Sequence, residues 1–285
     1  MAASQKLYAW AVPIIAPGSP WDHTWVTSYD NRAHPYPDIA AVKRAKQDYW
    51  YCWGGFHARG GTPNLPDGSL GSHNGDIKLA RCLAAPNADC SASFAARGTI
   101  FTYGVDGVCH QLANQVLYAT GRGGARPLTV SMAGGYWLSS GIYGAYGLQH
   151  SAWRNKIAAC AAAAAPPPSG VHGATRTRQS SSRGRTMKDV ASPNPPDEFE
   201  EHVGRVLGAD KLPLASQLLA LRAQFQTAAT AHAHSATAPT AAELNARNQR
   251  FLDDAAKLLG DDNFYAVFGV KAGTKVNLVL PDPSK

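Results

Sequence analysis

Residues 104–118 read GVDGVCHQLANQVLY, in which a turn-forming stretch is followed at once by a helix-forming one. The glycines favour a turn, and Leu112 and Val116, four residues apart, predict one face of a helix over residues 109–119. Cys109 is the first residue of that helix. A thiol at a helix N-terminus faces unpaired backbone N–H groups and the positive end of the helix dipole, which both stabilise the thiolate. We therefore predict that Cys109 is a nucleophile.

A cysteine nucleophile needs an imidazole within hydrogen-bond reach, often from a strand beside the helix. Two histidines stand in suitable contexts. His23 begins a predicted strand of residues 24–29, and His150 follows the nucleophile in the chain. His110 is adjacent to Cys109 and points about a third of a helical turn away from it, so we do not expect it to be the base.

Two short motifs carry a family resemblance: His-Thr-Trp-Val at residues 23–26 and Val-Cys-His-Gln-Leu at residues 108–112. Together they resemble the circularly permuted papain-like cysteine hydrolases, the NlpC-type superfamily with its lecithin:retinol acyltransferase-like and deSUMOylating isopeptidase-like branches. The resemblance covers about residues 7–135, and Val108 stands where those branches place Asn. The long insert of residues 54–94 has no equivalent in them.

This resemblance implies an antiparallel sheet packed on a Cys-bearing helix, with His23 as the base of Cys109. A third catalytic group has two candidates. His34 follows His23 by eleven residues, where the acyltransferase-like members place a second His, but its Pro-rich surroundings also read as a turn. His57 follows a Gly-Gly-Phe segment and would lie on a neighbouring strand.

A second resemblance is to transglutaminase-like hydrolases, through Gly-Val-Cys at residues 107–109 and His-Ser-Ala-Trp at residues 150–153. In this reading His150 is the base. No Asp occurs between His150 and Asp189, so Asn155 would have to orient the imidazole, as amides do in some papain-like enzymes. Either resemblance implies attack by the same thiol on an acyl carbon, an acyl-enzyme, and release to water or an amine.

Composition divides the chain. All seven Trp lie before residue 155, and every Glu lies after it. The formal net charge is +7 at pH 7, and residues 156–190 hold six basic side chains against Asp189. Because the excess lies in this Ala-, Pro-, Ser- and Arg-rich stretch, it does not indicate a nucleic-acid-binding face on a folded domain. We predict a papain-like thiol hydrolase domain over 1–158, a linker over 159–196 and a helical domain over 197–285.

The expected fold class is α+β, a permuted papain-like domain followed by a linker and a small helical bundle. β-branched and aromatic runs predict strands over residues 7–15, 24–29, 49–53, 99–103 and 128–132, and helices over 38–47 and 109–119. After the linker, apolar stripes predict three helices: one ended by Gly208, one containing Leu214 to Phe225, and one from Thr240 to Gly260 that opens with a capping box to Glu243. The tail of residues 275–280 alternates like a short strand.

No cofactor or metal is expected. The five Cys form no CxxC pair, and the histidines at 202, 232 and 234 form no ligand-like cluster. The Gly-rich runs lack the spacing of phosphate-binding loops. No apolar run approaches the ~18 residues of a transmembrane anchor, and the early apolar run is interrupted by Pro13. We expect a protein that is cytoplasmic, or secreted without a classical signal peptide.

The predicted function is that of a cysteine peptidase, amidase or deamidase acting on a peptide or protein with an amide side chain or isopeptide bond. One alternative is an acyltransferase or transglutaminase-like enzyme with the same nucleophile. Another is a non-enzymatic binding protein that uses the aromatic-rich first half as its surface. The sequence names neither the substrate nor the oligomeric state.

Overall fold

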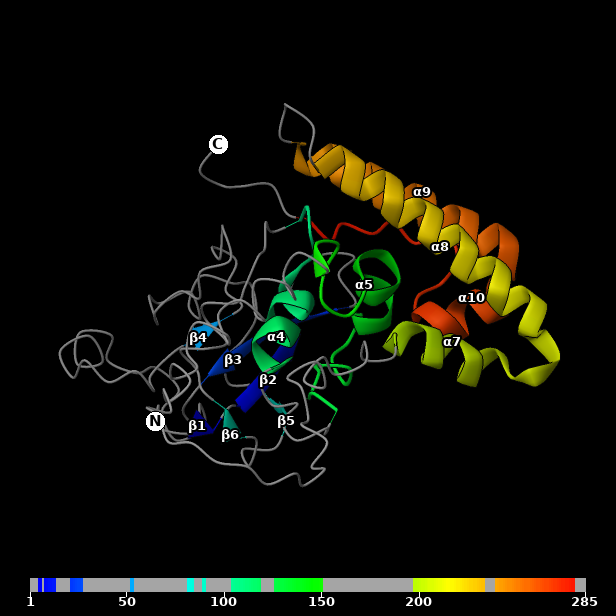
Figure 1. The fold of residues 1–285 in the computed structure, drawn as a ribbon. Helices are drawn as coiled ribbons and strands as arrows, with labels where there is room; N and C mark the ends of the chain where they lie inside the picture. The colour runs from blue at the N-terminus through cyan, green and yellow to red at the C-terminus, as the bar shows by residue number, and fades with distance from the viewer. Residues whose placement is uncertain are drawn as a thin grey trace, which may run out of the picture.

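The structure is a computed structural model of the chain. It describes residues 5–6, 8–13, 21–27, 52–53, 81–84, 89–90, 104–118, 126–150, 197–233 and 239–279. Within these residues the fold is α+β, as predicted, with strands in the first part of the chain and mainly helices after residue 104 (Figure 1). The predicted strand over 99–103, the predicted helix over 38–47 and the predicted linker lie outside the described residues.

An antiparallel sheet of order β4-β3-β2-β5 forms the first part, beside a separate pair, β1 and β6. Strand β2 (Tyr8–Pro13) pairs along its length with β3 (Asp22–Thr27), with Trp10 opposite Trp25. The remaining strands are short: β1 (Gln5–Lys6), β4 (Cys52–Trp53), β5 (Arg81–Ala84) and β6 (Asp89–Cys90). The strands predicted over 7–15, 24–29 and 49–53 are confirmed for their described residues, and β3 begins two residues earlier than predicted.

Helix α4 (Cys109–Leu117) packs on one face of this sheet. Ala9 of β2 and Val26 of β3 share a buried cluster with Ala113 and Leu117 of α4. The small alanines of β2 let the helix backbone approach the sheet closely. The prediction of a helix that begins at Cys109 is confirmed, and this packing fixes which strand lies beside the thiol.

Helix α5 (Tyr136–Tyr143) was not predicted from the sequence, and it follows a pair of glycines. The preceding Gly135 has φ 73°, and a Cβ there would lie 2.4 Å from Cβ of Trp21, so glycine is required at this close turn. The strand predicted over residues 128–132 is wrong. Val130 N–H donates to Oδ1 of Asn114 instead of to a neighbouring strand.

Four α-helices and one 3-10 turn make up the C-terminal part of the described chain: α7 (Glu198–Leu207), η5 (Ala209–Lys211), α8 (Leu212–Ala233), α9 (Ala241–Leu259) and α10 (Asp261–Phe268). The predicted end of α7 at Gly208 and the Thr240–Glu243 capping box of α9 are confirmed. Helix α10 was missed because Gly260 both ends α9 and begins α10.

The strand predicted over 275–280 is wrong for its described residues. Two side chains of α9 accept hydrogen bonds from the backbone of this segment: Oε1 of Gln249 accepts from Val276 N–H, and Oδ1 of Asn245 accepts from Val279 N–H. These two N–H groups are therefore not available to pair with a neighbouring strand.

The two predicted domains share one core in the described residues. Leu138 and Ile142 of α5 lie in the same buried cluster as Phe199 of α7 and Phe268 of α10, and Trp21 and Val108 belong to it as well. Figure 1 shows α5 between α4 and the C-terminal helices. The described residues of the two predicted domains therefore bury surface on each other through α5, which contacts α4 as well as α7, α8 and α10, and the division into domains stays a prediction.

Candidate functional site around Cys109

Cys109 lies at the first position of α4, where a short turn directs the chain into the helix. Gly104 N–H bonds to the carbonyl of Gly107, and Val108 N–H donates to Oε1 of Gln111, 3.1 Å away. Gln111 thus satisfies a backbone donor that the helix itself leaves open. The local sequence therefore sets the position of Cys109 at the helix N-terminus.

Tertiary packing places the thiol against the start of β3. Sγ of Cys109 lies 3.9 Å from the carbonyl oxygen of Asp22. The start of β3 is itself anchored: Asp22 N–H donates to the carbonyl of Gly134 at 2.9 Å, and Gly134 N–H donates to Oδ2 of Asp22 at 2.6 Å. The thiol therefore faces a fixed piece of backbone.

Burial raises the pKa of the Cys109 thiol above its ordinary value, because the charged thiolate loses its hydration. Hydrogen bonds from the backbone and side chain of Thr24 and from the backbone of His110 act in the opposite direction, and the Asp22 charge adds to the rise. The helix N-terminus on its own favours the thiolate, and a lowered pKa was the expectation from the sequence. That prediction is wrong for this arrangement, in which desolvation is the largest effect.

His23, the predicted base, lies next to the residues that touch the thiol but on the other face of the sheet. Thr24 and Val26 face α4, since Val26 packs on Ala113 and the Thr24 side chain interacts with the thiol. Strand alternation turns His23 away from α4. Its ring is fully buried and stacks on Trp25, with ring centroids 5.7 Å apart. The structure brings the strand of His23 to Cys109, but not the imidazole.

His110 directly follows Cys109 in the sequence, and its imidazole makes two buried hydrogen bonds. Nε2 lies 3.1 Å from the carbonyl oxygen of Asp22, and Nδ1 lies 2.8 Å from Oγ of Ser139. Burial lowers the pKa of His110 to about 4, so the ring is neutral at pH 7. A neutral ring with Nε2–H donates to the carbonyl of Asp22. Its Nδ1 is then an acceptor beside Oγ of Ser139, whose single proton can go to Nδ1 or to the carbonyl of Tyr136, 3.0 Å away. This role is structural, in line with the expectation that His110 is not the base.

The other predicted site residues are not brought to Cys109 by the described structure. His150 lines a cavity beside α8, and Cys109 does not line that cavity. His34, His57 and Asn155 lie outside the described residues.

The polar face of α4 was not recognised from the sequence as a connected set. Gln111, Asn114 and Gln115 are all buried, and each donates to a backbone carbonyl of the segment that follows α5. Asn114 also donates to the hydroxyl of Tyr136, which donates to Glu198. The sequence does contain a signal for this set: three amide residues lie among the apolar residues of α4, and buried amides require hydrogen-bond partners.

Neither a metal-binding cluster nor a membrane-spanning helix occurs in the part of the chain that the structure describes. No group of three or more His, Cys, Asp or Glu side chains there is placed to hold a metal ion. No helix among these residues is both long and apolar enough to cross a membrane. Comparisons of the chain with protein-family models, with curated proteins and with solved structures found no match.

Proposed function

We propose that the chain is a cysteine hydrolase that acts on an amide or isopeptide bond with Cys109 as its nucleophile, in a permuted papain-like arrangement. The observation that carries the proposal is the position of the thiol. Cys109 is the first residue of α4, and its sulfur interacts with Asp22 and Thr24, the two residues that flank His23 in β3. A Cys-bearing helix on a His-bearing antiparallel strand is the arrangement that the family resemblance implies.

Donors around the sulfur favour thiolate formation. The backbone and hydroxyl of Thr24 and the backbone of His110 each lower the pKa of Cys109. These groups oppose the cost of burial, and their effect increases as negative charge develops on sulfur. The described arrangement is then a resting state with a protonated thiol.

The proposed base is His23, which requires one local change in β3. In a β-bulge two successive residues oppose one on the partner strand, and a side chain is re-aimed. A bulge between His23 and Thr24 would turn the imidazole to the α4 side while leaving Val26 in place. Among the described residues, β4 pairs with Val26 and Thr27 of β3 and not with His23. A bulge at His23 would therefore interrupt only the backbone hydrogen bonds between β3 and β2.

The reaction then follows the usual thiol sequence. The imidazole takes the proton of Cys109, sulfur attacks the carbonyl carbon, and the C–N bond breaks as the imidazole protonates the leaving amine. Water cleaves the thioester, which releases the acid and restores the thiol. If an amine replaces water, the same intermediate gives an acyltransferase or transglutaminase-like reaction.

The proposal is tested by trapping the acyl-enzyme. The full chain is incubated with p-nitrophenyl acetate, and the acetylated residue is located by mass spectrometry, with the other four thiols as internal references: Cys52, Cys82, Cys90 and Cys160. Preferential acetylation of Cys109 that is lost in His23→Ala and kept in His150→Ala supports the proposed dyad. Loss in His150→Ala alone would replace it with the transglutaminase-like arrangement.

A non-enzymatic binding protein is the second candidate, and the raised pKa of the buried Cys109 thiol favours it. In that case Cys109 only fills space at the start of α4. Acetylation of Cys109 no faster than that of the four reference thiols, together with no effect of His23→Ala, would select this function over the hydrolase.

A further inference from the structure

A cavity of about 940 Å³ lies away from Cys109, between the residues that follow α5 and one face of α8. Its size is in the range of small-molecule sites. One side is formed by residues 143–150 and the other by α8 residues from Arg222 to Ala231, with Asp197 between them. The proposed hydrolase reaction makes no use of it.

The first side of the cavity is held rigidly by α4. Three amide side chains bind three successive carbonyls: Gln111 that of Gly144 at 3.0 Å, Asn114 that of Ala145 at 2.8 Å, and Gln115 that of Tyr146 at 2.7 Å. Leu148 N–H is bonded to the carbonyl of Asp106 in the same way. The cavity wall is therefore set before a ligand arrives, which reduces the ordering cost of binding.

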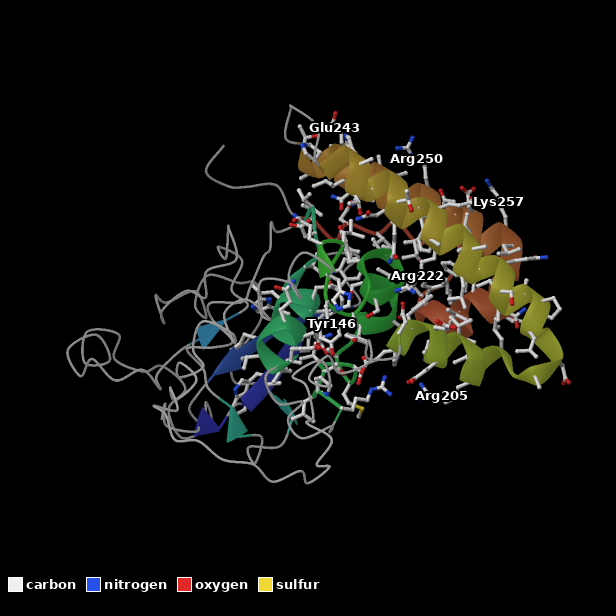
Figure 2. The ribbon with its side chains drawn as sticks, in the orientation of Figure 1. Tyr146, Arg205, Arg222, Glu243, Arg250 and Lys257 are labelled. Atoms are coloured by element: carbon white, nitrogen blue, oxygen red, sulfur yellow. The ribbon has the colours of Figure 1, made fainter. Side chains whose placement is uncertain are left out.

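Arg222 is a cation in the cavity lining, and four of its five N–H donors are used by hydrogen bonds within the protein. Its guanidinium is buried and donates to the carbonyls of Ser140 and Gly141 and to both carboxylate oxygens of Asp197. Figure 2 shows this side chain directed from α8 toward α5. Because Asp197 pairs with it, the two together add no net charge to the cavity. Arg222 therefore does not make this an anion site.

The α8 side of the cavity offers hydrogen-bond acceptors. The hydroxyl of Thr227 donates to the carbonyl of Ala223 at 2.9 Å, and that of Thr230 donates to the carbonyl of Gln226 at 2.8 Å. Each hydroxyl has only one proton, so these oxygens can only accept from a ligand. Gln226 donates to the carbonyl of Ile142, and its Oε1 adds a third acceptor.

The first side of the cavity also offers a flat aromatic wall for the apolar part of a ligand. The ring of His150 stacks on Tyr146 with centroids 5.4 Å apart, and both residues line the cavity.

We propose that this cavity binds an alkylammonium group. The ammonium donates to the hydroxyl oxygens of Thr227 and Thr230 and to Oε1 of Gln226, and the alkyl chain lies along Leu148 and the aromatic wall. A lysine side chain of a peptide and a free aliphatic amine both present this group. The site does not depend on the proposed hydrolase function.

The test is a ligand-observed NMR titration of the full chain with three probes: cadaverine, N-acetyl-lysine amide and the uncharged pentanediol. Saturable binding of cadaverine, of the lysine amide, or of both supports the site, and their ranking tells whether free amine or lysine is preferred. Binding of neither probe, or equal binding of pentanediol, overturns it.

The matched variants remove acceptors without changing shape. Thr227→Val combined with Thr230→Val should weaken amine binding at least tenfold, since two hydrogen bonds to a charged group are lost. Thr227→Ser should retain binding. Ser216→Ala is the control, because Ser216 makes the same hydroxyl bond to the carbonyl one turn earlier on the exposed surface of α8, outside the cavity. Equal affinity in the double variant and the control overturns the proposal, whereas Cys109→Ala should leave binding unchanged.

Discussion

His110 and Asp22 are joined across 88 residues of sequence by a buried hydrogen bond, with Nε2 of His110 3.1 Å from the carbonyl oxygen of Asp22. The Cys109 thiol lies 3.9 Å from the same oxygen. The carbonyl of Asp22 thus accepts from both Cys109 and His110 at the start of α4, and these contacts fix β3 relative to the helix. The consequence is that the charge state of His110 affects the stability of the candidate site.

Stability should fall as the pH is lowered through the range set by His110. Burial lowers its pKa from 6.5 to about 4, so between these values the unfolded chain binds the proton and the folded chain does not. The contribution is present above pH 6.5 and is lost as the pH falls toward 4. Between pH 7 and pH 5 we expect a loss of about 2 kcal/mol in the free energy of unfolding, measured by urea titration. His110→Ala should reduce this dependence, whereas His232→Ala, at an exposed position of α8, should not.

The Cys109 thiol should react slowly in the resting protein. Because burial raises its pKa, alkylation by iodoacetamide at pH 7 should be slower in the folded chain than in the chain unfolded in urea. Thr24→Val removes a hydroxyl that lowers the pKa of Cys109, so it should slow alkylation further. Peptide mass spectrometry measures the rate at this residue, and faster alkylation in the folded chain would contradict the raised pKa.

Gly141 should be essential to the shared core. A Cβ at this position of α5 would lie 2.7 Å from a ring carbon of Phe268 and 3.0 Å from one of Phe199, so Gly141→Ala should destabilise the fold by about 1–3 kcal/mol. Gly204 is the matched control in α7, where a Cβ would meet nothing within 4 Å. Gly204→Ala should stabilise by roughly 0.5–1 kcal/mol, because alanine is the better helix former. Thermal melts of both variants that shift in the same direction would show that α5 does not pack as described.

Arg222 should contribute strongly to the junction between α5 and α8. Arg222→Met removes one donor from each of the carbonyls of Ser140 and Gly141 and removes the cation paired with Asp197, so we expect a loss of about 2–4 kcal/mol in unfolding free energy. Arg250→Met is the control on the exposed surface of α9 (Figure 2) and should change it by less than about 0.5 kcal/mol. Equal denaturation midpoints for the two variants would be incompatible with the bonds of Arg222.

Cleavage between the two parts of the chain should not separate them. Trypsin has sites at Arg176, Arg178, Arg183 and Arg185 in the sequence that was predicted to be a linker. Because α5 shares its core with α7 and α10, fragments cut there should remain together in size-exclusion chromatography without denaturant and separate with it. Separate elution of two folded fragments in native buffer would support the prediction of independent domains.

The sequence by itself determined the local structure of this protein. The glycine turn and the apolar spacing placed the start of α4 at Cys109, Gly208 and Gly260 ended α7 and α9, and the Thr240 capping box began α9. These features depend on backbone conformation and on hydrogen bonds between residues a few positions apart, so a short stretch of sequence is enough to specify them.

The tertiary structure decided which groups meet. Alternation along β3 shows that His23 and Thr24 lie on opposite faces, but only the packing of Val26 on Ala113 shows that the Thr24 face meets α4. The raised pKa of Cys109 likewise results from burial by distant segments, which outweighs the helix N-terminus visible in the sequence. The shared core has the same origin: α5 is short and preceded by glycines, and its contacts with Phe199 and Phe268 join residues far apart in the chain. Desolvation and packing depend on these long-range contacts, which local sequence patterns do not encode.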